Sequence, residues 1–405
     1  MGGPTLRQDA RVIGLVAVAH GLSHFFQIAT AVLFPLIRED LGVSYAALGA
    51  TIAGYYVVSG VCQTLAGFAV DRFGARRVLF GGLALCVAGA LLAGLAQNYA
   101  TLLAAALIGG LGNSVFHPSD FAILNARVDP RRLGYAFSWH GIAGFLGYAV
   151  APAFGASLAA AFGWRGALLA AALLGAIVVA VLAAQRDALR AEPADSRRAG
   201  ANGGFAADLR VLASVPVLMC FGYFVLVAVG FIAIQTFGVS TMIALYGVNA
   251  ALASAALTAY LVGAAAGIFA GGFLAARFQR HDLVAVSGML ASAAFMLVIA
   301  STWIPAALLA PLFAATGFAG GVTNPSRDLI VRATTPPGAT GKVFGFVYSG
   351  LDVGSMATPV VFGWLLDQGH ASAVFYSVVA ALALNIVTVL NLPGMGSARA
   401  ASLAK

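Results

Sequence analysis

Polar side chains that can carry protons stand inside long apolar runs of the first half of the chain. They form two sets with the spacing i, i+4 and i+7: His20, His24 and Gln27, then Asn113, His117 and Asp120. Each set would share one face of a helix. Histidine titrates near neutral pH, and a carboxyl group withdrawn from water accepts a proton more readily than in solution. We therefore expect both faces to meet at one cavity in which protons are carried.

A second charged group lies inside a later apolar run, in the stretch NPSRDLIVR that begins at Asn324. Arg327 is the only Lys or Arg within an apolar run, and its planar fork can bond a carboxylate or phosphonate in two places. An ionisable group at membrane depth is costly and marks a functional site by default. The alternative is a structural role for Arg327 and Asp328. Their partner would then be Asp120 or Asp352.

The expected site residues come from these two groups. For binding a small polar or anionic substrate we expect Arg327, His24, Gln27, Asn113, His117, Asn324 and Tyr348. For carrying protons we expect Asp120, His24, His117, Asp328 and Asp352. The three aspartates in that set are the only acids, of fourteen in the chain, that fall inside apolar runs.

Other kinds of chemistry find less support in the sequence. Histidines at i and i+4 do bind metals, but His20, His24 and His117 have no Cys or carboxylate spaced to complete a site, so we expect no metal. An intramembrane hydrolase could use Ser23 or Ser119 with His117, although the metalloprotease motif HExxH is absent. The Walker motif for ATP is absent as well, and we expect neither a cofactor nor enzyme activity.

The composition makes lipid the expected solvent for most of the chain. Of its 405 residues 61% are hydrophobic and 9% are charged, whereas about a quarter of a soluble domain is charged. The apolar runs suit membrane helices of ~20 residues and do not alternate as barrel strands do. They lie at 12–37, 45–69, 78–96, 99–126, 133–160, 166–184, 211–236, 249–275, 283–302, 305–331, 343–366 and 372–392. We predict an all-α membrane protein with twelve transmembrane helices.

The basic residues lie between these runs and mostly share one side. Of the 22 Lys and Arg residues, 19 fall in the ends and loops of that side. Cytoplasmic loops carry such an excess, so we expect both termini in the cytoplasm. The positive net charge is then a consequence of topology and does not indicate a nucleic-acid partner.

The runs divide six and six around a charged segment. We expect a flexible linker at 186–208 between domains at 1–185 and 209–405. An offset of 207 residues aligns the halves without a gap; the aligned pairs include Gly110 with Gly317, Pro118 with Pro325, Pro130 with Pro337 and Pro152 with Pro359. Such parallel repeats build transporters with a central site. We predict two pseudo-symmetric six-helix bundles, each with its fourth helix broken at a proline, Pro118 or Pro325.

The loop after the second run has a distinctive pattern, GFAVDRFGARRVL, which starts at Gly67. It resembles the signature loop between spans 2 and 3 of the major facilitator superfamily. The matching residues are Gly67, Asp71, Arg72, Gly74, Arg76 and Arg77. The resemblance implies a secondary active transporter of twelve helices in which this loop helps to latch the cytoplasmic face. The second half holds a degenerate copy, GFLAARFQRHD, in which Ala276 replaces the Asp.

Two shorter stretches, SHFFQ from Ser23 and SVFHPSD ending at Asp120, resemble the fosmidomycin-resistance type of drug exporter. That type has Phe-His-Pro-Glu in its fourth span, and here Ser119 takes the position of the Glu. The resemblance implies proton-coupled export of a small molecule. Uptake or exchange of a small organic anion is the alternative, since either direction would use the same groups, and a receptor that does not transport is another. We expect a monomer in the lipid bilayer of a bacterial inner membrane.

The topology can be tested by labelling introduced cysteines from either side of the membrane. A cysteine at Ser196 should react from the cytoplasm and one at Gln97 from the opposite side, because an odd number of spans separates the two loops. Labelling of both positions from the same side would contradict the twelve-helix prediction.

Overall fold

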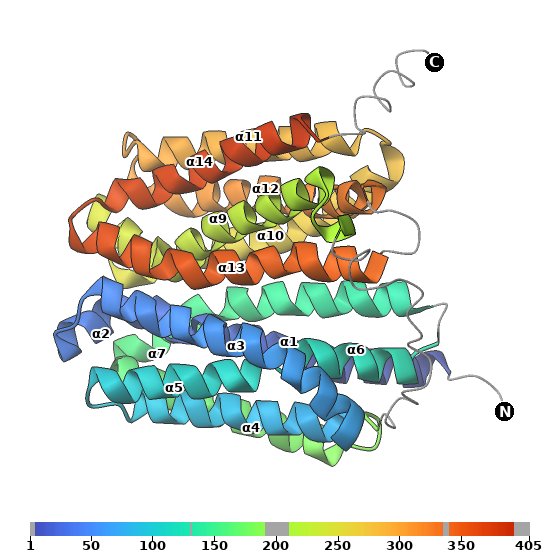
Figure 1. Ribbon diagram of the computed structural model, residues 1–405. Helices are drawn as coiled ribbons and strands as arrows, with labels where there is room; N and C mark the ends of the chain where they lie inside the picture. The colour runs from blue at the N-terminus through green and yellow to red at the C-terminus, as the bar shows by residue number, and fades with distance from the viewer. Residues whose placement is uncertain (1–4, 130–131, 191–209, 335–339, 393–405) are drawn as a thin grey trace, which may run out of the picture. The chain divides into compact units, whose positions relative to one another are not determined.

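The computed structural model describes residues 5–129, 132–190, 210–334 and 340–392. The described residues form helices, turns and short connections, with no strand among them. The chain divides into two compact units, Met1–Ala199 and Gly200–Lys405. Figure 1 shows the long helices of each unit with their axes roughly parallel. The prediction of an all-α membrane fold with two six-helix bundles is confirmed.

The N-terminal unit contains seven α-helices and a short 3₁₀ turn among its described residues. They are α1 (Leu6–Ala29), η1 (Ala31–Leu33), α2 (Phe34–Leu41), α3 (Tyr45–Phe73), α4 (Ala75–Gly94), α5 (Tyr99–Asn113), α6 (Phe116–Arg127) and α7 (Leu133–Ala184). Side-chain oxygens of Ser44 and Asn98 cap α3 and α5 by accepting from backbone N–H groups of the first turn. Within α7, Gly163 has φ 70° and ψ 173°, so two helices meet there.

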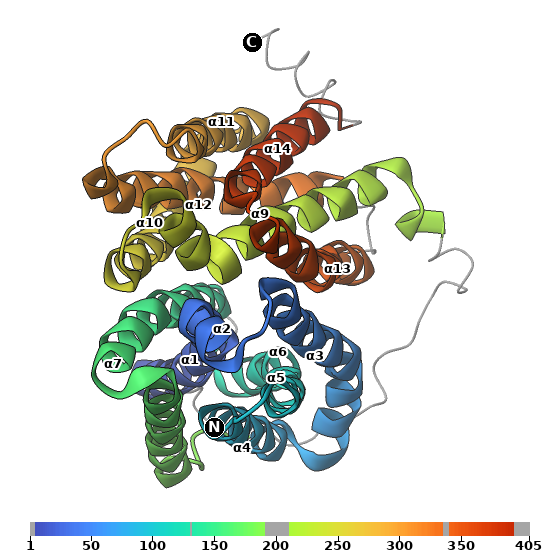
Figure 2. The same cartoon turned by 90° about the vertical axis from the view of Figure 1, so that its left-hand side faces the viewer.

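The described residues of the C-terminal unit repeat this arrangement. Its elements are α9 (Val215–Tyr246), α10 (Ala250–Arg277), α11 (His281–Ala300), η4 (Ala306–Leu308), α12 (Leu309–Ala333), α13 (Thr340–Asp367) and α14 (Ala371–Leu390). Figure 2 shows the helices of each unit closer to end-on. The predicted linker begins with turns at 186–189, and its residues from 191 onward lie outside the described part of the chain.

Each predicted membrane span overlaps a helix of the structure. Ten segments of the described residues are long and apolar enough to cross a membrane. The segment within α7 contains two of the predicted spans, one on each side of Gly163, and α13 adds a helix of 28 residues. The first span is less regular than predicted, because α1 ends at Ala29 and a 3₁₀ turn precedes α2.

The prediction of a proline break in both fourth helices is wrong for the second half. In the first half, α5 ends at Asn113 and α6 begins at Phe116, which puts Pro118 in the first turn of the new helix. A proline is tolerated there because the N–H groups of a first turn have no partner within the helix. In the second half, α12 runs through Pro325 from Leu309 to Ala333. Only the first half therefore has an interrupted fourth helix.

Glycines bring the helix backbones together in the same way in both units. A Cβ atom built on Gly110 would lie 2.3 Å from the carbonyl oxygen of Tyr55, and one on Gly317 would lie 2.0 Å from that of Tyr260. The two glycines are related by the 207-residue offset. Small residues allow this close approach in lipid, where apolar side chains gain little by leaving the solvent. The internal repeat of the sequence thus corresponds to a repeated packing contact.

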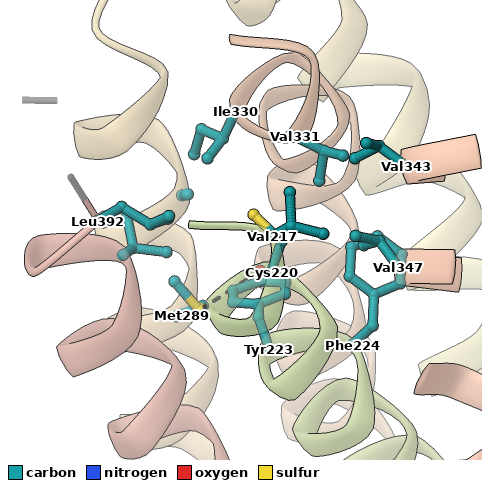
Figure 3. Close-up of a cluster of buried hydrophobic side chains, with 12 residues drawn as sticks. Val217, Cys220, Tyr223, Phe224, Met289, Ile330, Val331, Val343, Val347 and Leu392 are labelled. Atoms are coloured by element: carbon teal, nitrogen blue, oxygen red, sulfur yellow. Dashed lines mark hydrogen bonds between the residues drawn. The ribbon is translucent and has the colours of Figure 1, made fainter. Parts of the chain in front are cut away.

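The C-terminal unit has a buried apolar core that supports one of the candidate sites. Figure 3 shows side chains of α9, α11, α12, α13 and α14 meeting around Cys220 and Tyr223. The Tyr223 hydroxyl lies 3.8 Å from the sulfur of Met289 and donates toward it. Phe224, the next residue of α9, is fully buried in this core. Its ring is therefore held in a fixed position.

The close approach of α1 and α7 can be tested at Gly147. A Cβ atom there would lie 1.9 Å from the carbonyl oxygen of Gly21. Gly147→Ala should therefore push the two helices apart and cost about 1–3 kcal/mol. The measurement is the Tm of the purified protein in detergent. Gly141→Ala, on the same helix, is the matched control, because a Cβ atom on Gly141 meets nothing within 4 Å. Equal Tm values for the two variants would contradict the predicted close packing.

Candidate functional site

A fully buried carboxylate lies between two histidines in the N-terminal unit. His20 Nδ1 and His140 Nε2 each lie 3.1 Å from the same oxygen of Asp120, Oδ2. Asp120 has no exposed surface, and the two histidines are 3% and 5% exposed. Their rings stack with centroids 3.5 Å apart and planes inclined by 23°. One carboxylate oxygen is thus shared by two imidazoles inside the bundle.

Two further histidines lie close to His20. The ring centroid of His24 is 4.4 Å from that of His20, and the ring centroid of His117 is 5.3 Å from it. His117 is exposed, while His24 is partly buried. We call these four histidines together with Asp120 the histidine cluster.

Three helices position the cluster, and the first of them is distant in sequence from the other two. His20 lies on α1, Asp120 on α6 and His140 on α7. Helix α6 starts at Phe116, so His117 lies in its first turn and Asp120 in its second. Three positions apart, the two side chains share one face of the helix.

The groups of the cluster can each hold a proton. A buried carboxylate is costly unless a hydrogen bond or a positive charge compensates it. The described groups that face Asp120 Oδ2 are imidazoles, whose ring nitrogens can donate or accept a hydrogen bond. The other oxygen, Oδ1, is buried and has no hydrogen-bond partner among the described residues. This geometry suits binding and release of a proton.

A neutral hydrogen-bond network adjoins the histidine cluster along α1. The Gln27 amide donates to Asn113 Oδ1 over 2.9 Å, and the Asn113 amide donates to Ser59 over 2.8 Å. The hydroxyls of Tyr148 and Tyr56 both donate to Gln27 Oε1, the latter over 3.5 Å. The two faces that the sequence marks therefore do meet. Partly buried amides and hydroxyls of this kind can bind a polar molecule.

A separate charged group lies in the C-terminal unit. Arg327 Nε is 3.0 Å from Asp328 Oδ1, and its Nη1 donates to Asn324 Oδ1 over 3.3 Å. The Tyr348 hydroxyl donates to the same Asp328 oxygen over 2.8 Å. The guanidinium carbon of Arg327 lies 4.7 Å from the centre of the Phe224 ring and 5.8 Å from that of Tyr348. Aromatic faces and a carboxylate together hold this cation.

These contacts bear on the structural alternative for Arg327. Its ion pair is with the adjacent Asp328, and Asp120 is paired with histidines of its own unit. Asp352 is partly buried and makes no ion pair with another described residue. Within the C-terminal unit, the described ion pair of Arg327 is therefore not the expected one with Asp352. The 207-residue offset also places Arg327 at the repeat position of Asp120.

The predicted latch loop is a tight connection between α3 and α4. Gly74 joins the two helices with φ 83° and ψ 140°, a conformation that favours glycine. Arg76 Nη1 lies 3.5 Å from Asp187 Oδ1 and donates to the carbonyl oxygen of Arg186 over 3.3 Å. Arg72 and Arg77 are exposed, and a Cβ atom on Gly67 would meet nothing. The side chain of Asp71 lies outside the described part of the chain.

The sequence-based prediction gives no role to several residues of the histidine cluster, the neutral network and the Arg327 group. Among them are His140, Ser59, Tyr148 and Phe224. Periodicity within one helix cannot show that His140 of α7 faces Asp120 of α6. The one signal available for His140 is that it is a histidine inside an apolar run, whereas His20 is marked by its spacing from His24 and Gln27. The Ser23 hydroxyl, considered above as a nucleophile, donates to the carbonyl of His20 over 2.7 Å.

The sequence of the chain is similar to those of known membrane transporters. The family model of the Major Facilitator Superfamily matches residues 16–250 and 219–403. The multidrug resistance protein B homolog of Mycobacterium tuberculosis (strain CDC 1551 / Oshkosh) is 31% identical over 179 residues, which is 44% of this chain and 33% of that protein. The fosmidomycin resistance protein of Escherichia coli K12 is 25% identical over 179 residues, 43% of each chain. Each match spans less than half of the relative's length.

Solved structures support the same fold over nearly the whole chain. Crystal structures of a bacterial homologue of the human lysosomal transporter Spinster match it with TM-scores of 0.75 and 0.73. The sequence identities are 15% and 16%, and each match covers 96% of both chains. At such low identity the likeness establishes the fold alone. Nothing in these comparisons indicates catalytic activity.

Proposed function

Because this chain belongs to the major facilitator superfamily, we propose that it is a proton-coupled secondary active transporter that exports a small polar or anionic molecule by alternating access. The observation that carries the proposal is the position of Asp120, a buried carboxylate with one oxygen 3.1 Å from each of two histidines. A group that must lose or gain a proton when its surroundings change can couple proton flow to a conformational change.

The coupling would use the histidine cluster. Protonation of Asp120 removes its negative charge. Protonation of an adjacent imidazole instead supplies a positive charge that compensates the carboxylate. Exposed His117 gives this buried group a titratable neighbour at the surface of the unit. We infer that Asp120, His24 and His117 carry the proton, with Asp328 and Asp352 as the next candidates.

The substrate class follows from the polar groups near the cluster and from Arg327. Gln27 and Asn113 offer amide groups, and Arg327 can bind an anion once Asp328 releases it. The names of the multidrug and fosmidomycin resistance relatives support export as the direction. We propose His24, His117, Asn324 and Tyr348 as further contacts of the substrate.

The expected setting is the inner membrane of a bacterium. The positive charges at loops of one side favour cytoplasmic termini. We propose that the protein works as a monomer, and that its latch is the loop formed by Gly67, Asp71, Arg72, Gly74, Arg76 and Arg77.

A second candidate function is proton-coupled uptake or exchange of a small organic anion. The guanidinium of Arg327, held between Asp328, Asn324 and two aromatic rings, favours it. Flux measurements in proteoliposomes with a panel of labelled organic anions, antibiotics and neutral metabolites would distinguish the two. Export predicts transport toward the side that corresponds to the cell exterior when protons move inward.

Asp120→Asn should abolish transport driven by a pH gradient, because an amide cannot take up and release the proton. Exchange of substrate between the two sides should persist in part, since that process needs no net proton movement. The measurement is pH-driven flux and exchange in proteoliposomes with the substrate that the panel identifies.

Glu39→Gln is the control for removing a carboxylate, because Glu39 is exposed on α2. It should retain pH-driven flux. If pH dependence survives in Asp120→Asn, His24→Asn and His117→Asn, the proton route lies elsewhere, and Asp328 and Asp352 become the candidates.

Arg327→Lys should lower the affinity for an anionic substrate at least tenfold, about 1.4 kcal/mol. Lysine keeps the charge but cannot bond a carboxylate or phosphonate in two places. The measurements are substrate binding to the purified variant and its Tm. Arg332→Lys is the matched control, because Arg332 is exposed at the end of the same helix.

A purely structural Arg327 would give a different pattern. The variant would then melt at a lower temperature, while the surviving folded protein would bind substrate with unchanged affinity. That result would refute the anion site and leave the role of Asp120 intact.

A further inference from the structure

Three imidazoles of the histidine cluster have ring nitrogens that lie close to one another. His20, His117 and His140 each offer a ring nitrogen, and these three atoms all lie within 4.8 Å of one another. Asp120 Oδ2 lies 3.1 Å from His20 Nδ1 and 3.1 Å from His140 Nε2. The three histidines and the carboxylate come from α1, α6 and α7, so the fold creates the arrangement.

The spacing is close to that of a four-coordinate metal site. Zinc binds imidazole nitrogen and carboxylate oxygen at about 2.0–2.1 Å, so ligand atoms around a tetrahedral ion stand about 3.3 Å apart. The two distances from Asp120 Oδ2 already approach that value. To bind the ion, His117 would have to move further than the other ligands; it is an exposed side chain in the first turn of α6. Its ring can turn inward without disturbing a packed core.

A buried carboxylate oxygen without a hydrogen-bond partner also points to a cation. Asp120 Oδ1 is buried and makes no hydrogen bond with another described residue. Polar atoms buried in this way are costly unless a ligand satisfies them. A set of three imidazoles and one carboxylate suits borderline divalent ions such as Zn²⁺ and Co²⁺.

We propose that His20, His117, His140 and Asp120 form a binding site for a single divalent transition-metal ion. The sequence-based expectation of no metal rested on the lack of a completing ligand, and the fold supplies two, His140 and Asp120. This inference goes beyond proton coupling and does not require that the protein transports anything. Since a metal needs neutral imidazoles, metal and protons would compete for the same nitrogens.

The test is metal binding to the full-length protein, purified in detergent without a polyhistidine tag. We expect one Zn²⁺ per chain by titration calorimetry. Co²⁺ in place of Zn²⁺ should give the visible absorption bands of a four-coordinate site. His140→Asn and Asp120→Asn should each weaken binding at least tenfold, and lowering the pH from 7.5 to 5.5 should weaken binding to the unaltered protein.

His370→Asn is the matched control, because His370 is an exposed histidine of the C-terminal unit. It should bind Zn²⁺ as the unaltered protein does. His117→Asn guards against misfolding, since an exposed residue can be replaced without opening a core; it should keep the Tm and lose affinity. The proposal is overturned if no saturable binding occurs, or if His117→Asn and His140→Asn bind Co²⁺ as tightly as the unaltered protein. Binding without any transport activity would instead contradict the proposed function alone.

Discussion

Asp120 is a carboxylate in the interior of a membrane-embedded bundle, and its burial sets requirements for the elements around it. A charge removed from water needs a partner of opposite sign, a proton or several hydrogen bonds. The N-terminal unit meets the requirement with two imidazoles 3.1 Å from one oxygen. It also starts a new helix at Phe116, which carries His117 and Asp120 on one face. The interrupted fourth span therefore supplies two members of the histidine cluster.

The close packing of α7 against α1 brings two histidines to the same carboxylate. Gly147 and Gly21 bring α7 against α1, which is why His140 can reach the same carboxylate as His20. A larger side chain at Gly147 would separate the helices and the two rings. The cluster thus depends on glycines that carry no chemistry of their own.

Much of the fold could be predicted, because its main signals are local. The length of each apolar run shows that a helix crosses the membrane, and the repeat shows that two units share one packing pattern. The spacing of Gln27 and Asn113 also marks faces that do meet. Contacts between helices have no such signal, so the part played by His140 and Tyr148 was missed. The continuity of α12 through Pro325 was missed as well, since tertiary packing decides whether a proline interrupts a helix.

The two halves share the same helix packing but carry opposite charges at equivalent positions of their fourth helices. The same offset that relates Gly110 to Gly317 relates Asp120 to Arg327. A guanidinium stays protonated at every physiological pH, whereas a carboxyl group and an imidazole can each exist with or without a proton. The Arg327 group pairs locally with Asp328, so its positive charge is compensated whatever happens in the other unit. The groups that can lose or gain a proton are therefore concentrated in the histidine cluster of the N-terminal unit, while the fourth helix of the C-terminal unit holds a permanent cation beside a carboxylate.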